Sequence, residues 1–396
     1  MISRIHGWRV KAASGLVLLG LVVAGKSEAA EAPPSLGLRV NSSGVLTKNG
    51  APYRGVGVNY YDAFIRTLRN PADTSYRAGF SQLGAKNIPF ARFAAGGWTA
   101  KDLRLYQTDK EAYFRLLDGV VQSAEKSNVG LIATLFWSIT AVSDAVGEPR
   151  ERWGDAKSKT RQFMRSYTRD VVSRYANSPA IWGWEFGCEL SLPVDLPNPP
   201  QRSGKFAQRA LSFATFNSAA LDFAQVVRGI DSHRILLTGN SIPRAAAYHN
   251  TAGDGMKPDT QKQFASILLR DNPGPFNPIC IHAAPASTVR YFGDRRVTYA
   301  ELLNACVGIA RSAGKALYLE EFVPVPGTPD GFLGMSQREY FSSELAAIQS
   351  SGVPLASVWI YDRKLTPDRS NLTFDNERSY MLEMIGTLNR TLSGRN

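Results

Sequence analysis

The chain of 396 residues is poor in the side chains that build disulfide scaffolds and metal centres, with three cysteines and four histidines. Cys188, Cys280 and Cys306 are too few for a disulfide framework, so we expect buried free thiols. A Cys188–Cys280 disulfide, the alternative, would have to join strands that are not neighbours. The histidines show no metal-ligand spacing, and Gly55-Val-Gly57 lacks the third glycine of a dinucleotide loop. We therefore expect no metal and no cofactor.

Long apolar runs are also absent, with one exception near the amino terminus. Residues 12–25 are apolar and follow three basic side chains, but the run is shorter than the ~20 residues of a membrane span. Small residues follow at 27–29 and offer a cleavage site. The pattern predicts a signal peptide over residues 1–29, a secreted or periplasmic protein, and no membrane span in the mature chain. An uncleaved anchor is the alternative, and Lys26 speaks against it by ending the apolar run early.

Acidic residues are outnumbered, with 34 Asp and Glu against 46 Lys and Arg, and the formal net charge is +12. Cleavage after residue 29 would remove four positive side chains and one negative one, so the charge would become 12 − 4 + 1 = +9. A basic exported protein could favour anionic polymers or envelope surfaces. Scattered arginines on helix faces explain the excess more simply, because no long basic run with interleaved aromatic residues occurs. We expect no nucleic-acid partner.

What the chain does have is an alternation of short apolar runs with helical patterns. At 44% apolar and 20% charged residues, it can bury a large core. Eight such runs predict strands at 54–61, 88–93, 131–137, 182–190, 234–240, 278–282, 315–322 and 355–361. This rhythm predicts a single α/β domain over residues 36–390, a (β/α)₈ TIM barrel. Asn49-Gly50 lies between two short strands and predicts a β-hairpin ahead of the barrel.

Two of the predicted strands end in carboxylates. Glu189 ends the fourth, and Glu320 and Glu321 end the seventh. Barrel enzymes keep their chemistry at the carboxyl ends of the strands, and two facing carboxylates are the apparatus of glycoside hydrolysis. Each glutamate taken alone could equally belong to a structural ion pair. Glu185 lies in mid-strand and is expected to pair with Arg92, and strand alternation predicts that only one of Glu320 and Glu321 points inward.

These strand ends resemble glycoside hydrolase family 5, the barrel family of cellulases and β-mannanases. That family ends its fourth strand in Asn-Glu and its seventh in Glu followed by an aromatic residue, as in Glu321-Phe322 here. The resemblance implies Glu189 as acid/base and Glu321 as nucleophile. It also implies that Arg92 orients the nucleophile, that His282 belongs to the site, and that Trp359 lies under the sugar next to the scissile bond.

Further aromatic residues fall at or after strand ends, where their faces could stack on sugars. Trp98 and Trp137 have this position. The expected substrate-binding set is therefore Arg92, Trp98, Trp137, Cys188, His282 and Trp359. The implied protein is a monomeric, secreted retaining β-glycoside hydrolase that cleaves a β-glucan or β-mannan.

The chain departs from the family at two supporting positions. Cys188 stands where the family has asparagine, and Ala284 where it has the tyrosine of His-x-Tyr. The asparagine hydrogen-bonds the sugar 2-hydroxyl, whereas a thiol is a weak donor and acceptor. One hypothesis is a site adapted to a sugar with a different 2-position. The alternative is a carbohydrate-binding pseudoenzyme with weakened catalysis.

Overall fold

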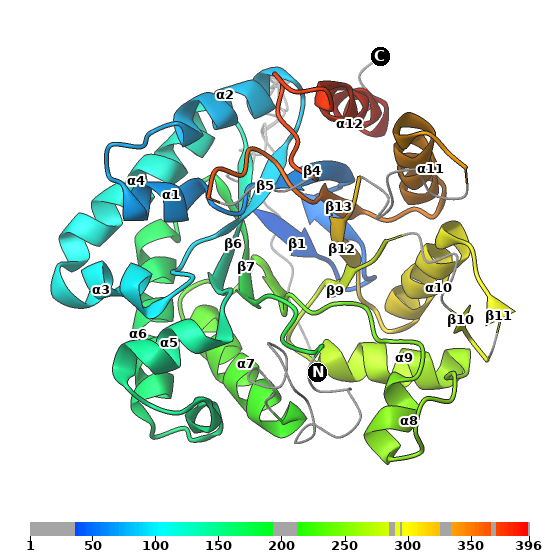
Figure 1. The fold of residues 1–396 in the computed structure, drawn as a ribbon, viewed down its shortest axis with the longest axis horizontal. Coiled ribbons are helices and arrows are strands. Elements are labelled where there is room, and N and C mark those ends of the chain that lie inside the picture. The colour runs from blue at the N-terminus through cyan, green and yellow to red at the C-terminus, as the bar shows by residue number, and fades with distance from the viewer. Residues whose placement is uncertain are drawn as a thin grey trace, which may run out of the picture. The chain divides into compact units, whose positions relative to one another are not determined.

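The computed structural model describes residues 36–192, 212–284, 290–293, 295–324, 334–365 and 370–394. Eight parallel strands form one sheet, and helices surround it (Figure 1). The strands are β4 (Gly55–Asn59), β5 (Phe90–Ala94), β6 (Gly130–Phe136), β7 (Ile181–Gly187), β8 (Ile235–Leu237), β9 (Ile279–His282), β12 (Leu317–Phe322) and β13 (Leu355–Val358). Their order is β8-β7-β6-β5-β4-β13-β12-β9, so the predicted (β/α)₈ barrel is confirmed. The predicted signal peptide, residues 1–29, lies outside the described part.

The barrel is nearly closed, with its seam between β8 and β9. In the described residues no ladder joins these two strands, and an isolated bridge connects Leu236 on β8 with Asn277, which precedes β9. The side chain of Asn272 spans the seam, because its Oδ1 accepts hydrogen bonds from Thr238 Oγ1 at 2.8 Å and from the Cys280 amide at 2.9 Å. A buried amide therefore replaces part of the missing ladder.

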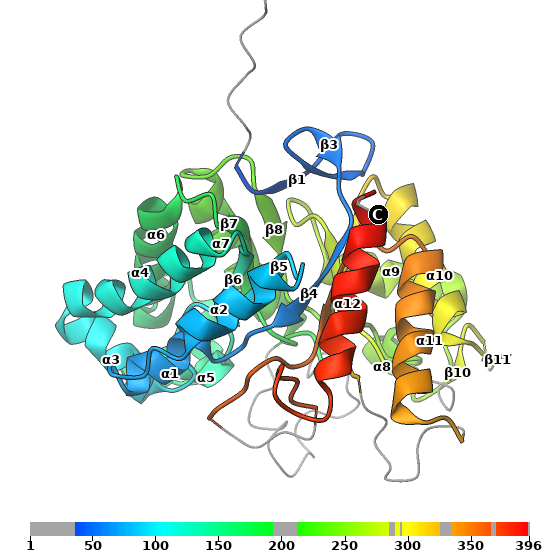
Figure 2. The ribbon, with the colours of Figure 1, turned by 90° about the horizontal axis from the view of Figure 1, so that it is seen from above.

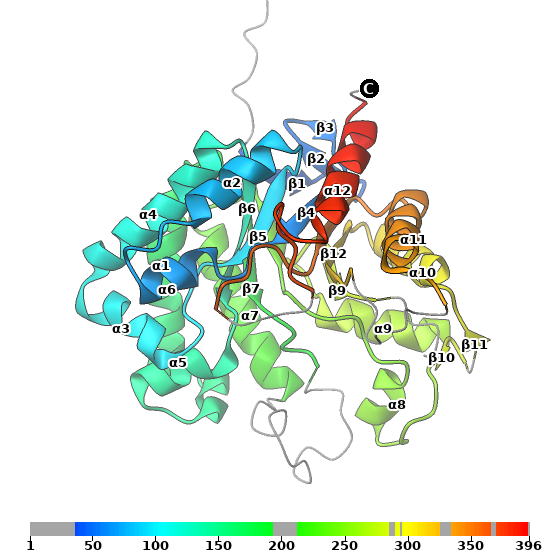
Figure 3. The same cartoon turned by 45° about the horizontal axis from the view of Figure 1, so that its top comes forward.

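The helices follow the strands around the barrel, as the oblique view in Figure 3 shows. They are α1 (Ala63–Arg69), α2 (Tyr76–Ala85), α3 (Ala100–Thr108), α4 (Lys110–Lys126), α5 (Ile139–Val146), α6 (Lys159–Tyr175), α7 (Phe213–Arg228), α8 (Ala247–Ala252), α9 (Gln261–Asp271), α10 (Tyr299–Ser312), α11 (Gln337–Ser350) and α12 (Ser379–Leu392). Capping boxes at Thr298 and Ser336 start α10 and α11. The described part also contains a 3₁₀ helix (Arg150–Gly154) and two short paired strands, β10 (Arg290–Tyr291) and β11 (Arg295–Arg296). Among the described residues, no helix is long and apolar enough to cross a membrane.

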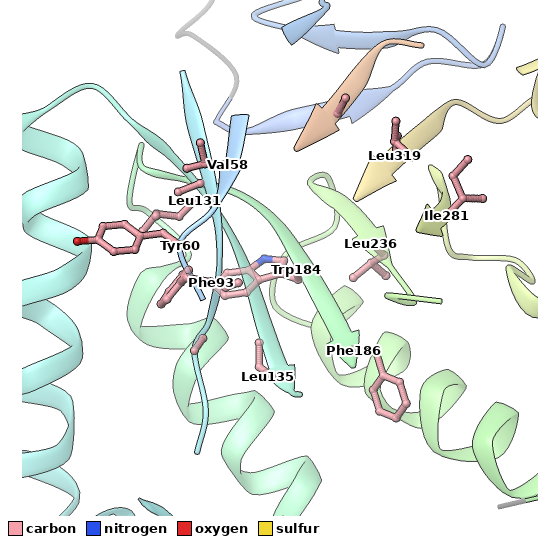
Figure 4. Packing of buried hydrophobic residues seen from close by; sticks show 14 of the residues in the cluster. Val58, Tyr60, Phe93, Leu131, Leu135, Trp184, Phe186, Leu236, Ile281 and Leu319 are labelled. Atoms are coloured by element: carbon pink, nitrogen blue, oxygen red, sulfur yellow. The ribbon is translucent and has the colours of Figure 1, made fainter. Parts of the chain in front are cut away.

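Outward-facing strand residues and inward-facing helix residues form the main hydrophobic layer, part of which is shown in Figure 4. A second, smaller cluster fills the barrel interior and includes Phe90, Ile132, Tyr318 and Leu355. Strand side chains alternate in direction, so the residues two positions farther along these strands face the same interior. Those residues are Arg92, Thr134, Glu320 and Ser357. A polar layer therefore lies directly above an apolar one, at the carboxyl end of the barrel.

The expected amino-terminal hairpin is part of a three-stranded antiparallel sheet. It contains β1 (Leu38–Val40), β2 (Leu46–Lys48) and β3 (Ala51–Pro52). Asn49 and Gly50 have φ values of 51° and 80°, which the predicted turn between β2 and β3 requires. Leu38 and Leu46 belong to the cluster that fills the barrel interior. The sheet covers the end of the barrel at which the strands begin (Figure 2).

One buried carboxyl gives a stability prediction. Glu344 on α11 is fully buried, and neither carboxyl oxygen has a hydrogen-bond partner among the described residues. Burial raises the pKa of Glu344 well above its usual value. The folded state therefore binds this proton more tightly than the unfolded state does, and stability falls as pH rises above the ordinary glutamate pKa, by about 1.4 kcal/mol per pH unit until the folded pKa is reached. Glu344→Gln should raise the melting temperature at pH 8 and leave it nearly unchanged at pH 4. Thermal unfolding at both pH values checks this, with exposed Glu383→Gln as the matched control.

Candidate active site

Glu189 is presented by a tight contact between the ends of β7 and β8. Its backbone has φ = 53°, and its amide donates a hydrogen bond to the Gly239 carbonyl at 2.7 Å. Gly239 has φ = 72°, and a Cβ at this position would lie 1.7 Å from the Gly187 carbonyl oxygen. Only glycine permits this approach. The contact holds Glu189 just beyond β7, with its side chain 41% exposed at the barrel mouth.

The expectation that only one of Glu320 and Glu321 points inward is wrong. The pairing register of β12 with β9 shifts between Leu319 and Glu321, so the simple alternation is broken there. Both carboxylates consequently reach the same imidazole, that of His282. Nε2 lies 3.2 Å from Glu320 Oε2, and Nδ1 lies 3.5 Å from Glu321 Oε2. Glu320 is fully buried, whereas the Glu321 side chain keeps 15% exposure toward the mouth.

His282 is the centre of a cluster of three carboxylates, because its Nδ1 also lies 3.0 Å from Glu189 Oε1. Burial alone would lower the pKa of this imidazole. The negative charge of Glu321 and the hydrogen bonds to Glu189 and Glu320 outweigh burial and raise the pKa of His282 to about 10. At neutral pH the ring is therefore an imidazolium that donates from both nitrogens.

Arg92 on β5 connects the second half of the site and is fully buried. Its Nη2 and Nε donate to Glu185 at 2.7 and 2.9 Å, and the predicted pair with Glu185 is confirmed. Its Nη1 donates to Glu321 Oε1 at 2.7 Å and to Asn59 Oδ1 at 3.0 Å. The guanidinium also lies over the Trp137 ring, 4.3 Å from its centroid. Arg92 thus holds Glu321 in place, and the buried carboxylate of Glu185 compensates the positive charge of Arg92.

The carboxyl groups differ in their electrostatic environment. Burial raises the pKa of Glu321, and the charges of His282 and Arg92 offset only part of that rise. Burial likewise raises the pKa of Glu185, to about 8. For Glu189 burial acts in the same direction, but the hydrogen bond and charge of His282 outweigh it and bring its pKa below the usual value. In the free protein, Glu189 is therefore ionised.

Cys188 lies beside the carboxylate expected to act as nucleophile. Its thiol donates toward Glu321 Oε1, with Sγ 3.8 Å from that oxygen. Burial raises the pKa of the Cys188 thiol well above its usual value, so the group stays protonated. All three cysteines are free, and the alternative disulfide between Cys188 and Cys280 is excluded.

Aromatic rings form one wall of the site around Tyr61, which follows β4. Its ring centroid lies 5.4 Å from that of Trp98, 5.0 Å from that of Trp137 and 6.2 Å from that of Trp359. Cys188 packs against the same cluster. Trp98 and Trp359 are partly exposed, which leaves aromatic surface open to a ligand.

The structure therefore brings all eight candidate residues together at one end of the barrel. They are Arg92, Trp98, Trp137, Cys188, Glu189, His282, Glu321 and Trp359. The sequence pattern did not identify Tyr61 as the centre of the aromatic wall, and Glu321 was preferred over Glu320. The adjacency of Tyr61 to the end of the first strand was the available signal for the former. For Glu320, alternation from Tyr318 already allowed an inward direction, but the register shift that brings Glu321 inward as well has no sequence signal.

The fold and the strand-end carboxylates define a (β/α)₈ barrel like that of the family 5 glycosidases. The endo-1,4-beta-mannanase from Rhizomucor miehei superposes with a TM-score of 0.64 at 14% identity, over 90% of this chain and 99% of that one. The endo-beta-1,4-mannanase from Thermotoga petrophila gives 0.60 at 16% identity, over 88% and 79% of the two chains. At these identities the likeness is one of fold.

Sequence similarity points to the same group of proteins, although no protein-family model matches the chain. Mannan endo-1,4-beta-mannosidase A from Hypocrea jecorina is 33% identical over 149 residues, 35% of this chain and 30% of that protein. Its namesake from Podospora anserina is 29% identical over 148 residues, 35% of each. The chain thus spans about a third of the length of the curated relatives that it matches.

Proposed function

We propose that this protein is a retaining β-glycoside hydrolase that cleaves a β-linked polysaccharide or oligosaccharide by double displacement. One observation carries the proposal. Glu189 and Glu321, from the ends of two different strands, lie 3.0 and 3.5 Å from the same His282 Nδ1 atom. These two oxygens can therefore be no farther apart than the sum of those distances. This fits the ~5–5.5 Å between the carboxyl groups of retaining enzymes and falls short of most inverting pairs.

In the first step the Glu321 carboxylate attacks the anomeric carbon, and the glycosidic bond breaks as Glu189 gives its proton to the leaving oxygen. In the second step Glu189 takes a proton from water, whose oxygen replaces Glu321 on the sugar and restores the free carboxylate. Arg92 supports this assignment, because its Nη1 holds one Glu321 oxygen at 2.7 Å and leaves the other available.

The acid role requires that Glu189 gain a proton when substrate binds. Its side chain is 41% exposed in the free protein, so a sugar in the cleft displaces water that now stabilises the carboxylate. Loss of this water raises the pKa of Glu189 toward the value that an acid needs. Once Glu321 is esterified, its negative charge is gone and the pKa of Glu189 falls again, which suits the base role in the second step.

The relatives named mannan endo-1,4-beta-mannosidase make β-mannan the first substrate to test, with β-glucan second. The partly exposed rings of Trp98 and Trp359 offer apolar faces on which sugar rings can stack. The carbohydrate-binding pseudoenzyme remains the alternative, and Cys188 motivates it. We further propose that residues 1–29 are a signal peptide, that residues 36–390 form the catalytic domain, and that the protein is exported as a monomer.

Incubation of the purified chain with a panel of β-mannans and β-glucans tests the proposal. We expect reducing ends to accumulate on one of these polymers, and the anomer released first should keep the β configuration. Release of the inverted anomer would refute the double displacement. Binding in an affinity gel without any product would favour the pseudoenzyme.

The variant Cys188→Asn distinguishes a site adapted to a different sugar from a site that has lost part of its catalytic activity. A thiol 3.8 Å from Glu321 Oε1 leaves little room for a larger amide, so we expect kcat/KM on the preferred substrate to fall. If instead the site has merely lost a 2-hydroxyl contact, asparagine should restore a hydrogen bond of ~1.5–3 kcal/mol and raise kcat/KM about tenfold or more. Kinetics on matched mannose and glucose substrates decide between these results, and a gain on every substrate would contradict adaptation.

A further inference from the structure

Three metal-binding donors from three separate segments converge at the barrel mouth. Cys188 Sγ, a ring nitrogen of His282 and a Glu321 carboxylate oxygen all lie within 4.8 Å of one another. We propose that this trio binds a zinc-like divalent cation in competition with the sugar substrate. Thiolate, imidazole and carboxylate are the three ligand types that zinc prefers.

The donors lie close to the spacing of a tetrahedral ion. Ligand atoms about 2.0–2.3 Å from a tetrahedral metal are roughly 3.3–3.8 Å from each other. Sγ lies 3.8 Å from one Glu321 oxygen, Oε1, and Nδ1 lies 3.5 Å from the other, Oε2, so the carboxylate has to turn until one oxygen faces both donors. Glu189 Oε1 lies 3.0 Å from the same Nδ1 and can supply the fourth ligand.

The other ring nitrogen of His282 is already positioned for metal binding. Its Nε2 lies 3.2 Å from Glu320 Oε2, and Glu320 is fully buried. This is the carboxylate–histidine–metal arrangement, in which the carboxylate orients the ring and increases its basicity. Glu320 takes no part in the two-step hydrolysis, and the proposed metal site would explain why a buried carboxylate lies beside His282.

The charges balance when the ion binds. The cation displaces one proton from the Cys188 thiol and one from His282 Nδ1, and both leave to solvent, so the total charge of the site is unchanged. The ion takes the place of the Nδ1–H donor that now faces Glu189. Arg92, 2.7 Å from Glu321 Oε1, opposes the cation, and the three carboxylates Glu189, Glu320 and Glu321 around His282 favour it.

Occupancy would engage the carboxylate that has to attack the sugar. Inhibition of hydrolysis by zinc therefore rests on the proposed function, whereas binding of zinc does not. Asparagine at position 188 would not form a comparable site, because its amide is a poor zinc ligand.

Titration of the full chain with zinc chloride in a calorimeter tests binding, and cobalt(II) absorbance reports whether a thiolate is a ligand. We expect one site with a thiolate-to-cobalt band. Cys188→Ser should abolish that band and weaken zinc binding more than 100-fold, beyond the ~10–100-fold loss expected for Glu320→Gln, whose residue only orients a ligand. Cys306→Ala, which removes a buried thiol on α10, is the control and should bind zinc normally.

Each of these measurements either supports the zinc site or contradicts it. A band that survives in Cys188→Ser, or zinc affinity equal in wild type and Cys188→Ser, overturns the site. Binding that disappears in Cys306→Ala but not in Cys188→Ser also overturns it. If zinc binding depends on Cys188 but the protein hydrolyses none of the polymers, the metal site is supported and the proposed hydrolase is contradicted.

Discussion

Glu189→Gln should lose about 10²–10⁴-fold in kcat/KM on a mannan or glucan and far less on an aryl glycoside with an acidic phenol as leaving group. A phenol of low pKa departs without a proton from the enzyme, so the acid is dispensable for that bond. Glu321→Gln should lose activity on both substrates, because no leaving group replaces the nucleophile. Steady-state kinetics of both variants on the paired substrates measure the two losses.

Exposed Glu383→Gln on α12 serves as the control and should match the wild type on both substrates. The pattern of the two losses is more informative than their size. Equal losses of Glu189→Gln on polymer and aryl glycoside would contradict its role as acid. Recovery of Glu321→Gln on the aryl substrate would mean that the two assignments are exchanged.

The fold could be predicted because barrels leave strong local signals. Eight apolar strands, helical periodicity between them and the Asn49-Gly50 turn are properties of neighbouring residues. Strand ends were harder to place. The fifth strand, expected at 234–240, is only Ile235–Leu237 as β8. The chain turns away at Gly239 because its backbone packs against Gly187 of another strand, and such a contact is visible only in three dimensions.

The residues of the candidate site could be predicted from the sequence, but the electrostatic interactions among them could not. A resemblance at strand ends was sufficient to find Glu189, Glu321 and Arg92. The register shift in β12, which lets Glu321 as well as Glu320 reach His282, depends on pairing with neighbouring strands. The convergence of Cys188 with His282 and Glu321 likewise escaped a search for ligands at short sequence spacing, because the three residues come from separate segments.

Arg92→Met should produce the largest loss of stability. The substitution leaves Glu185 fully buried, with the Thr134 hydroxyl at 2.7 Å as its remaining partner among the contacts described. Removal of one member of a buried ion pair costs about 3–5 kcal/mol. The pKa of Glu185 is about 8 even beside Arg92, so without the guanidinium this carboxyl should fold protonated. Wild type and variant should both lose stability as pH rises from the ordinary glutamate pKa toward 8, since the unfolded state loses its proton first. The extra cost of the variant should grow only above about pH 8, where the wild-type carboxyl ionises beside Arg92. Denaturant unfolding of both proteins at pH 7 and pH 9 measures both effects.

The double variant Arg92→Met/Glu185→Gln separates the structural role of Arg92 from its role at Glu321. Replacing both charges removes the isolated buried carboxylate, so stability should return most of the way to the wild-type value. Activity should not return, because Glu321 still lacks the Nη1 donor that holds its Oε1 at 2.7 Å. A double variant that regains stability together with full kcat/KM would show that Arg92 acts only through Glu185. One that stays as unstable as Arg92→Met would show that the arginine stabilises the barrel through Asn59 and Trp137 instead.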